Sequence, residues 1–378
     1  MPWKETTMSD QRQYFVKDLL EHKLTMAAAC RKYGISRSTG HKWLRRYQSQ
    51  PDQPLQEISR RPKNSPAKTC QQLEALICSV RQQYHWGALK IWQHLQNQQI
   101  PDLPTVKTVH NILKRQGLLT PTPTTSTPPQ RFEREQPNQL WQCDFKGYWT
   151  IAGRKYYPLT ILDDHSRFLL GLVLCEDVKM SSAWEVLWKV FGEYGLPEQL
   201  LCDNAFGSQF VHLEGLSWFE SRLIRLGIKP IHGRPYHPQT QGKVERLHGT
   251  LEREVVPHLD CSDRASCQRG LDQWRVEVYN SVRPHQALEG AVPLSRWHPA
   301  SRARPATLPE LEHRAGSESR LVSSGGEISW RGYPIRVSWG ISGERVGVVE
   351  SEEWVEVYYG EHRVRRVAKK DLTKTRLC

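Results

Sequence analysis

Three acidic residues in the middle of the chain occupy positions where packing alone does not explain a carboxylate. Asp144 lies within the largely apolar segment WQCDFKG, Asp203 ends the apolar run of LLCDNAFGS, and Glu245 lies in HPQTQGKVERLHGTL. Carboxylates are rarely buried unless a cation or a metal ion compensates their charge. If the three converge, their mutual repulsion requires a divalent cation. A small set of oxygen ligands with open positions suits Mg²⁺ or Mn²⁺ rather than Zn²⁺.

The chemistry that such a site supports is phosphoryl transfer. Two ions about 3.5 to 4 Å apart can hold the attacking and leaving oxygens of an in-line displacement, so no protein nucleophile is needed. We therefore predict two Mg²⁺ ions, with Mn²⁺ as a substitute, held by Asp144, Asp203 and Glu245. Taken singly, Asp203 is equally a turn cap and Glu245 equally a solvated helix residue. The ordered set favours the catalytic interpretation.

The charge of the chain points to a polyanionic partner. Its 378 residues are enough for two to four domains, and 53 Lys and Arg against 40 Asp and Glu give a net charge of +13. Residues 1–135 hold 21 basic and 10 acidic residues, residues 136–300 hold 18 and 19, and residues 301–378 hold 14 and 11. A near-neutral middle between basic ends indicates a functional core whose basic flanking segments bind a polyanion. A basic surface that is merely solvated gives similar counts.

Membrane insertion and structural zinc are both disfavoured. No apolar stretch approaches the roughly 20 residues of a spanning helix, and the first residues lack the apolar segment of a signal peptide. We therefore expect a cytoplasmic protein with no membrane partner. The nine cysteines include no CxxC pair, which predicts free thiols.

Segments rich in Pro, Ser and Thr divide the chain. They predict linkers at 51–65 and 120–135. The domains expected between them are a helix-turn-helix domain at 8–50, a second helical, helix-turn-helix-like domain at 66–119, a catalytic core at 136–300 and a β-rich domain at 313–378.

The first domain carries a helix-turn-helix pattern. The sequence Tyr33–Gly34–Ile35–Ser36 supplies a turn with a glycine and an N-capping serine before a basic helix. A helical bundle with a basic solvated face is the alternative, but the basic residues concentrate after the turn. The expected DNA contacts are Arg37, His41, Lys42, Arg45 and Arg46. In the second helical domain, the segment at 105–116 is either a second recognition helix or a scaffold helix.

The central domain alternates strands and helices. Three β-rich runs joined as hairpins are followed by a helix at 181–194, a strand at 198–203, a helix at 218–226, a strand at 228–232 and a helix at about 240–256. This order predicts an α/β/α layered core with a mixed five-stranded sheet within a multidomain α+β protein. After residue 313, short β segments predict a small β-barrel. The basic residues of this domain either contact a phosphate backbone or simply face solvent, and the sequence favours neither role; they are Arg331, Arg336, Arg363, Arg365 and Arg366.

Five segments carry a family resemblance: WQCDFKG, LTILDDHSR, LLCDNAFGS, RPYHPQTQGKVERLHGTLEREV and YNSVRPHQALEGAVPLSRW. Together they resemble the integrase-type core of bacterial insertion-sequence transposases with a DDE triad. Within these, they are most similar to the IS-four-eighty-one group, related to the IS-three group and to retroviral integrases. The resemblance covers residues 136–300 and implies an RNase H-like fold, with Asp144, Asp203 and Glu245 as a triad that binds two Mg²⁺ ions. It also implies cleavage of element ends, strand transfer into target DNA, a homodimer or higher oligomer on double-stranded DNA, and a bacterial, nucleoid-associated location.

Some residues depart from the family pattern. The 41 residues between Asp203 and Glu245 exceed the usual separation, and Gly249 and Glu252 replace basic residues of the catalytic helix. The resemblance then leaves DNA contacts to Lys243, Arg246 and His248, together with Arg234, Tyr236 and His237 in the preceding loop.

The remaining motif residues are expected to serve the framework. We expect Asp163 and Asp164 to shape a turn, and Arg283 to brace the core. Three functions stay open: an active DDE transposase, which the sequence favours, a transposase-derived DNA-binding regulator with a silent core, and an RNase H-like nuclease.

Overall fold

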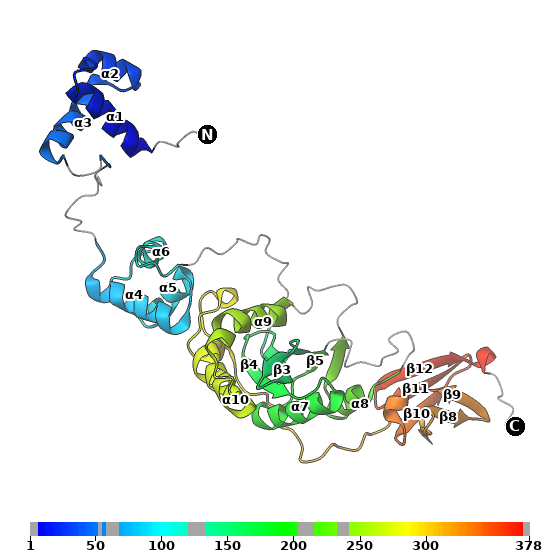
Figure 1. Ribbon diagram of the computed structural model, residues 1–378. Coiled ribbons are helices and arrows are strands. Elements are labelled where there is room, and N and C mark those ends of the chain that lie inside the picture. Colours follow the sequence, from blue (N-terminus) through cyan, green and yellow to red (C-terminus); the bar gives the residue numbers. More distant parts are fainter. Residues whose placement is uncertain are drawn as a thin grey trace. The chain divides into compact units, whose positions relative to one another are not determined.

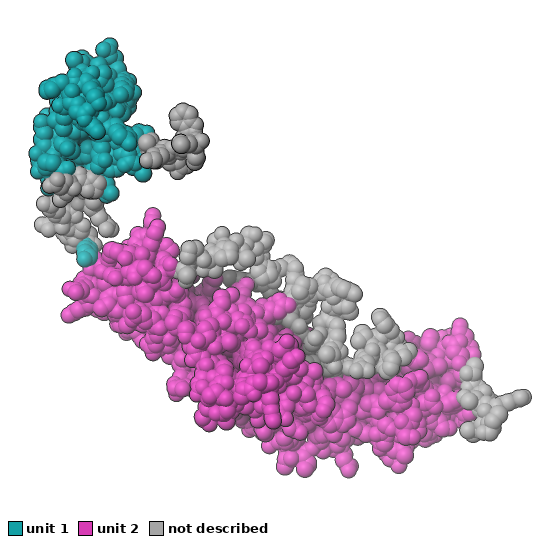
Figure 2. Space-filling view, viewed as in Figure 1, with its two compact units in different colours: residues 1–68 teal, residues 69–378 magenta. Residues whose placement is uncertain are grey.

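The computed structural model describes residues 7–51, 55–57, 68–119, 133–202, 215–232 and 242–372. The chain forms two compact units, residues 1–68 and residues 69–378, coloured separately in Figure 2. No helix among these described residues is long and apolar enough to span a bilayer.

The first unit is a bundle of three short helices: α1 (Met8–Leu20), α2 (Met26–Lys32) and α3 (Arg37–Ser49), shown in blue in Figure 1. Each helix begins at a hydroxyl N-cap that accepts a backbone N–H from the third helical residue; in α3 this is Ser36 with Thr39. Gly34 takes φ +64° in the turn before α3. The predicted helix, glycine turn, serine cap and basic helix are therefore all present.

A glycine inside α3 allows the helices of this bundle to approach closely. A Cβ on Gly40 would lie 2.8 Å from Cys30 Sγ and 3.0 Å from both Met26 Sδ and Phe15 Cζ. The glycine thus sits where α3 crosses the other two helices. The sequence analysis missed this role, because a glycine in a basic helix has no apolar periodicity to mark it.

We expect Gly40→Val to destabilise the first unit by about 1 to 3 kcal/mol, because the added carbons overpack this crossing. Amide hydrogen exchange of residues 8–49 in the full chain measures the effect. Gln48→Val, at an exposed position of the same helix, is the matched control. Equal protection losses in the two variants would contradict a packing origin.

The second unit begins with three helices, α4 (Gln71–Tyr84), α5 (Ala88–Asn97) and α6 (Val106–Arg115). Ile77, Ile91, Leu95, Val109 and Leu113 form their buried core. Val278 and Val282, which follow much later in the chain, pack against the same cluster. These helices are therefore joined to the central domain by packing as well as by sequence.

The central domain is built on a mixed sheet. Its strands are β1 (Trp141–Phe145), β2 (Trp149–Ile151), β3 (Arg154–Asp163), β4 (Leu169–Cys175), β5 (Gln199–Cys202) and β6 (Lys229–His232). The path β2-β3-β1-β5-β6 has β4 paired to β3; β1 runs antiparallel to β3 and parallel to β5. The sheet has six strands rather than the expected five, because the first β-rich segment breaks around Gly147 into β1 and β2.

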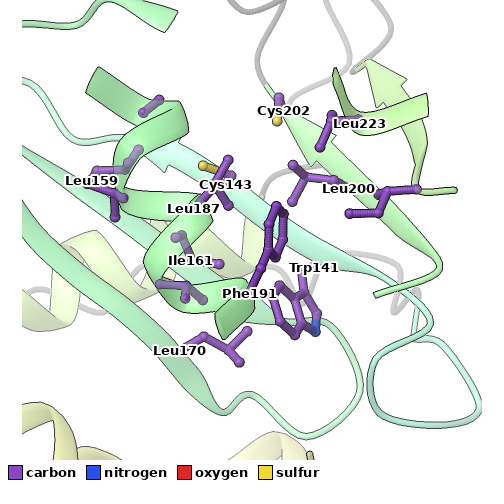
Figure 3. Close-up of a cluster of buried hydrophobic side chains, with 14 of the residues drawn as sticks. Trp141, Cys143, Leu159, Ile161, Leu170, Leu187, Phe191, Leu200, Cys202 and Leu223 are labelled. Carbon is purple, nitrogen blue, oxygen red and sulfur yellow. The ribbon is translucent and has the colours of Figure 1, made fainter. Parts of the chain in front are cut away.

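Helices cover the sheet with two separate apolar cores. Side chains of α7 (Met180–Tyr194) and α8 (Trp218–Arg225) pack on one core, which contains Trp141 and Cys143 of β1; Figure 3 shows Leu187 and Phe191 of α7 there. Side chains of α9 (Gly242–Glu254) and α10 (Arg264–Gln273) form the other with Leu162 and Leu172. Because successive side chains of a strand alternate, Gln142 and Asp144 belong to the α9 face.

Short helical segments complete the central domain. A π-helical segment, η4 (Trp274–Asn280), continues directly from α10. The 3-10 segments are η3 (Val256–His258), η5 (Gln286–Leu288) and η6 (Pro293–Arg296) here, with η7 (Trp339–Ile341) and η8 (Lys369–Asp371) further on.

The C-terminal strands form open sheets. The strands β7 (Glu318–Leu321), β10 (Arg345–Glu350), β11 (Trp354–Tyr359) and β12 (His362–Ala368) make an antiparallel sheet of order β12-β11-β10-β7. The strands β8 (Glu327–Trp330) and β9 (Tyr333–Arg336) pair with each other in a separate two-stranded sheet. The predicted β-barrel is therefore wrong for the described residues. The two sheets share one hydrophobic cluster, so their inner faces are buried without closure of the strand ladder.

Candidate active site

Asp144 occupies a defined position in the sheet. It is half-buried on β1, its Cα pairs with that of Thr160 on β3, and the preceding Cys143 pairs with Cys202 on β5. Asp203 follows Cys202 directly in sequence but lies outside the described residues. The loop residues predicted to grip DNA, Arg234, Tyr236 and His237, also lie outside them.

Glu245 is exposed on α9, in a row of side chains that contacts β2, β3 and the residue that follows β1. Glu245, His248 and Glu252 lie at i, i+3 and i+7, along one side of the helix. The Nε2 atom of His248 lies 3.0 Å from Thr160 Oγ1. A Glu252 carboxylate oxygen lies 2.6 Å from Lys146 Nζ and accepts a hydrogen bond of 3.1 Å from Trp149 Nε1. The row bearing Glu245 is thus fastened to β1 and its neighbours.

His248 forms part of the framework of this site. Thr160 Oγ1 donates a 3.1 Å hydrogen bond to the Asp144 carbonyl oxygen, so His248 Nε2–H must donate to the hydroxyl. Burial, with a smaller effect from the Lys146 charge, lowers the pKa of His248 to about 4, so the ring is neutral at physiological pH. The ring, for which the sequence analysis predicts a DNA contact, is hydrogen-bonded to the sheet.

Lys243 lies on the other flank of α9. Its ammonium is 2.5 Å from Asp164 Oδ1, and Asp164 is fully buried. Burial, aided by the nearby Arg167 charge, lowers the pKa of Lys243 to about 8 despite this carboxylate. Lys243 is therefore engaged within the protein, whereas Arg246, one turn along, is exposed.

The turn after β3 has the structure expected of the DDHSR motif. Asp163 Oδ1 accepts hydrogen bonds from the Ser166 backbone N–H, at 2.7 Å, and from the Ser166 hydroxyl, at 2.6 Å. Its Oδ2 accepts one of 2.8 Å from the backbone of Asn138. Burial raises the pKa of Asp163. The prediction of a turn-shaping role is confirmed for Asp163, whereas the side chain of Asp164 bonds to β1, to α9 and to the backbone of Arg134.

The basic residues of α3 divide into two groups. Arg37, His41 and Arg45 are exposed at i, i+4 and i+8, along one side of the helix. Lys42 is also exposed but lies 3.3 Å from Glu57, and Arg46 is half-buried with its guanidinium 5.4 Å from the Trp43 ring centroid. Arg37, His41 and Arg45 thus form an exposed basic row on α3.

A second charged cluster joins the helices α4–α6 to the core. Arg283 makes two hydrogen bonds, of 2.8 and 2.9 Å, to the Glu254 carboxylate at the end of α9. Lys90 Nζ and Trp86 Nε1 approach the same carboxylate at 2.7 and 3.2 Å. Burial alone would raise the pKa of Glu254, but Arg283 and Lys90 lower it to about 2.

This cluster confirms that Arg283 braces the core. The sequence analysis missed the partner, Glu254, because 29 and 164 residues separate it from Arg283 and Lys90. Its position in the segment EREV gave no sign that it would be buried.

The donor set of the site fits a hard cation. Asp144 and Glu245 both offer carboxylate oxygens, the ligands that Mg²⁺ and Mn²⁺ prefer. Within the described part of the chain, no three His, Cys, Asp or Glu side chains group closely enough to hold a metal ion.

Family models match most of the chain in segments. Models described as an integrase core domain match residues 134–238 and 226–293, and models described as a homeodomain-like domain match residues 9–55 and 39–113. The first pair includes all three predicted carboxylates. The second pair includes the helices of the first unit and most of α4–α6.

Curated relatives come from retroviruses and from insertion sequences. The Gag-Pro-Pol polyprotein of Mason-Pfizer monkey virus is 34% identical over 119 residues, which are 32% of this chain and 6% of the polyprotein. The transposase for insertion sequence element IS904 of Lactococcus lactis subsp. lactis (strain IL1403) is 23% identical over 42% of this chain and 61% of its own length. The insertion element IS476 39.2 kDa protein of Xanthomonas euvesicatoria is 23% identical over 43% of this chain and 44% of its own length. The matched regions thus span less than two thirds of each of these relatives.

Solved structures share a more distant likeness. A chain of the simian T-cell lymphotropic virus intasome in complex with PP2A regulatory subunit B56 gamma aligns over 78% of this chain and 99% of its own, with 18% identity and a TM-score of 0.37. The HTLV-2 integrase catalytic core domain in complex with magnesium, in its trimeric form, aligns over 43% and 99%, with 19% identity and a TM-score of 0.33. Together, the family models and the relatives of known sequence show an integrase core domain with N-terminal homeodomain-like domains in this chain, and a similarity to the transposases of bacterial insertion sequences.

Proposed function

We propose that this chain is a DDE transposase that binds the terminal inverted repeats of an insertion sequence and transfers the cut strands into target DNA. The observation that carries the proposal is the attachment of α9: inside an integrase core domain, the row bearing Glu245 is bonded to Thr160 on β3, which itself donates to the backbone oxygen of Asp144, and to Lys146, two residues after Asp144. Such an attachment brings a helix carboxylate toward a strand carboxylate.

The third carboxylate follows from the connectivity of the chain. The parallel register pairs Cys143 with Cys202, and one further residue along each strand is Asp144 or Asp203. This order of residues along the two paired strands supports the assignment of Asp144, Asp203 and Glu245 as the triad of an RNase H-like core at 136–300.

The three carboxylates would hold two Mg²⁺ ions, with Mn²⁺ as a substitute. When bound, these ions supply nucleophile activation and charge stabilisation at the leaving oxygen. The residues of the chain itself would hold these ions and keep the carboxylates in position. The carboxylates form no covalent bond to DNA. The neutral ring of His248 attaches α9 to the sheet through Thr160.

DNA is bound and brought to the core by the helical domains at 8–50 and 66–119 and by the β-rich domain at 313–378. The linkers at 51–65 and 120–135 follow the two helical domains in sequence. Joining two element ends requires at least a homodimer on double-stranded DNA. In the core, Arg246 and the loop residues Arg234, Tyr236 and His237 are the proposed DNA contacts; Lys243 is better explained by its bond to Asp164.

We expect Arg37→Ala and Arg45→Ala each to weaken binding of terminal-repeat DNA and to lower the slope of log affinity against log salt by about 1 for each phosphate contact removed. Fluorescence anisotropy at several salt concentrations measures both quantities. Arg31→Ala, at an exposed basic position on α2, is the matched control. A salt slope equal to that of the wild type in both α3 variants would contradict their role.

The proposed function is tested by a strand-transfer assay with oligonucleotides that carry the ends of the element encoding this chain. Joined products are expected with Mg²⁺ or Mn²⁺ and not with EDTA, and not with oligonucleotides of scrambled end sequence. Binding of the ends without joining, under either metal and with a target plasmid present, would favour the DNA-binding regulator with a silent core. Metal-dependent hydrolysis of unrelated DNA without joining would favour the nuclease.

A further inference from the structure

The side chain of Asp164 is a buried carboxylate with several hydrogen-bond donors. It is 0% exposed, and its Oδ1 accepts hydrogen bonds from Gln142 Nε2 at 2.7 Å and Lys243 Nζ at 2.5 Å. Its Oδ2 accepts a third, of 2.8 Å, from the backbone N–H of Arg134. Removing a carboxylate from water costs several kcal/mol unless such partners compensate it, so the arrangement holds its partners strongly in place.

Two of these partners belong to the elements that carry the proposed catalytic carboxylates. Gln142 lies two residues before Asp144 on β1, and side chains at i and i+2 of a strand share one face. Lys243 lies two residues before Glu245 at the start of α9. One oxygen atom of Asp164 therefore connects the strand of one proposed ligand to the helix of another.

A second connection lies on the opposite flank of the same helix. His248 Nε2 lies 3.0 Å from Thr160 Oγ1, which donates to the backbone oxygen of Asp144. Lys243 and His248 stand on either side of Glu245 in sequence, so α9 is attached to the sheet both before and after this carboxylate. Glu245 itself is exposed and needs such support to keep a fixed position.

We propose that Asp164 is a positioning residue, which through Lys243 and Gln142 fixes Glu245 relative to Asp144 and so sets the metal affinity of the site. This inference rests on the proposed function, because it concerns the same carboxylates. Asp164 does not touch DNA or metal in this role. It acts by holding the first turn of α9 against β1.

The neighbouring Asp163 provides a matched control. It is equally buried, at 0% exposure, and equally rich in hydrogen bonds, but its side-chain partners are Ser166 and Asn138, neither of which lies on α9 or β1. Asp163→Asn should therefore cost stability without moving Glu245. Asp164→Asn should both lower the stability and displace Glu245.

The test measures Mn²⁺ binding to the full chain by electron paramagnetic resonance, together with strand transfer and thermal unfolding. Asp164→Asn and Lys243→Met are each expected to weaken Mn²⁺ binding about 10- to 100-fold, the usual effect of removing a group that orients a ligand. Because Asp164 and Lys243 act as one unit, the double variant should be no weaker than either single one. Asp163→Asn should bind Mn²⁺ as the wild type does.

The outcomes separate the two proposals. If wild-type Mn²⁺ binding does not depend on Asp144 and Glu245, the proposed function fails. If it depends on both but Asp164→Asn binds Mn²⁺ as tightly as the wild type, the positioning role alone is wrong. Equal weakening by Asp163→Asn and Asp164→Asn would also overturn it, since general loss of structure would then explain the effect. Where Asp164→Asn unfolds, Lys243→Met supplies the same comparison.

Discussion

Asp144→Asn, Asp203→Asn and Glu245→Gln are each expected to lower strand transfer about 10³-fold or more, while binding of the element ends is retained. Charge stabilisation by a metal ion is worth several kcal/mol, and each 1.36 kcal/mol corresponds to a factor of ten in rate. An amide oxygen keeps the shape of the side chain but removes the negative charge that holds the cation. The helices that bind the element ends lie elsewhere in the chain, so affinity for the ends should persist.

The comparison needs a carboxylate outside the site. Glu198→Gln is suitable, because Glu198 is exposed just before β5, at the opposite end of that strand from Asp203. Strand transfer and end binding are measured for all four variants with Mg²⁺ and with Mn²⁺. Strand transfer at the wild-type rate in any triad variant would remove that residue from the catalytic set.

The sequence predicted most of the elements near the site and little of what holds them together. Local sequence patterns predicted the apolar strands around Asp144 and before Asp203 and the helix of Glu245. All three elements are present in the structure. The contacts of Thr160 with His248 and of Asp164 with Lys243 join residues 88 and 79 positions apart. No local pattern identifies such partners, so the sequence predicted DNA contacts for His248 and Lys243 but not these bonds within the protein.

The errors in the fold have a similar origin. Alternating β segments after residue 313 predicted a barrel, because periodicity identifies strands without identifying the neighbours of each strand. In the structure, β8 and β9 pair with each other, which leaves β12 and β7 at the edges of a separate sheet. The extra strand β2 arose because one polar break, at Lys146–Gly147, is enough to divide a short β-rich segment.

The cluster around Glu254 should dominate the stability of the second unit. We expect Glu254→Gln to lower the free energy of unfolding by about 3 to 5 kcal/mol, because it leaves Arg283 and Lys90 without the buried anion that both contact. Thermal unfolding of the full chain measures the loss. Glu252→Gln, on the same helix, removes a more exposed ion pair and should cost no more than about 1 kcal/mol. Similar losses in the two variants would contradict the special role of Glu254.

The same carboxyl predicts the acid sensitivity of the protein. Its pKa is about 2 in the folded chain against an ordinary value of 4.5, so its ionised form stabilises the fold above about pH 4.5 and this stabilisation is lost as the pH falls toward 2. A shift of this size is worth about 3 kcal/mol. Denaturant unfolding measured from pH 6 down to pH 2 should therefore show a steep acid limb in the wild type. Glu254→Gln has no carboxyl to protonate, so its limb should be shallower by about the same 3 kcal/mol; an unchanged limb would assign the acid sensitivity to other groups.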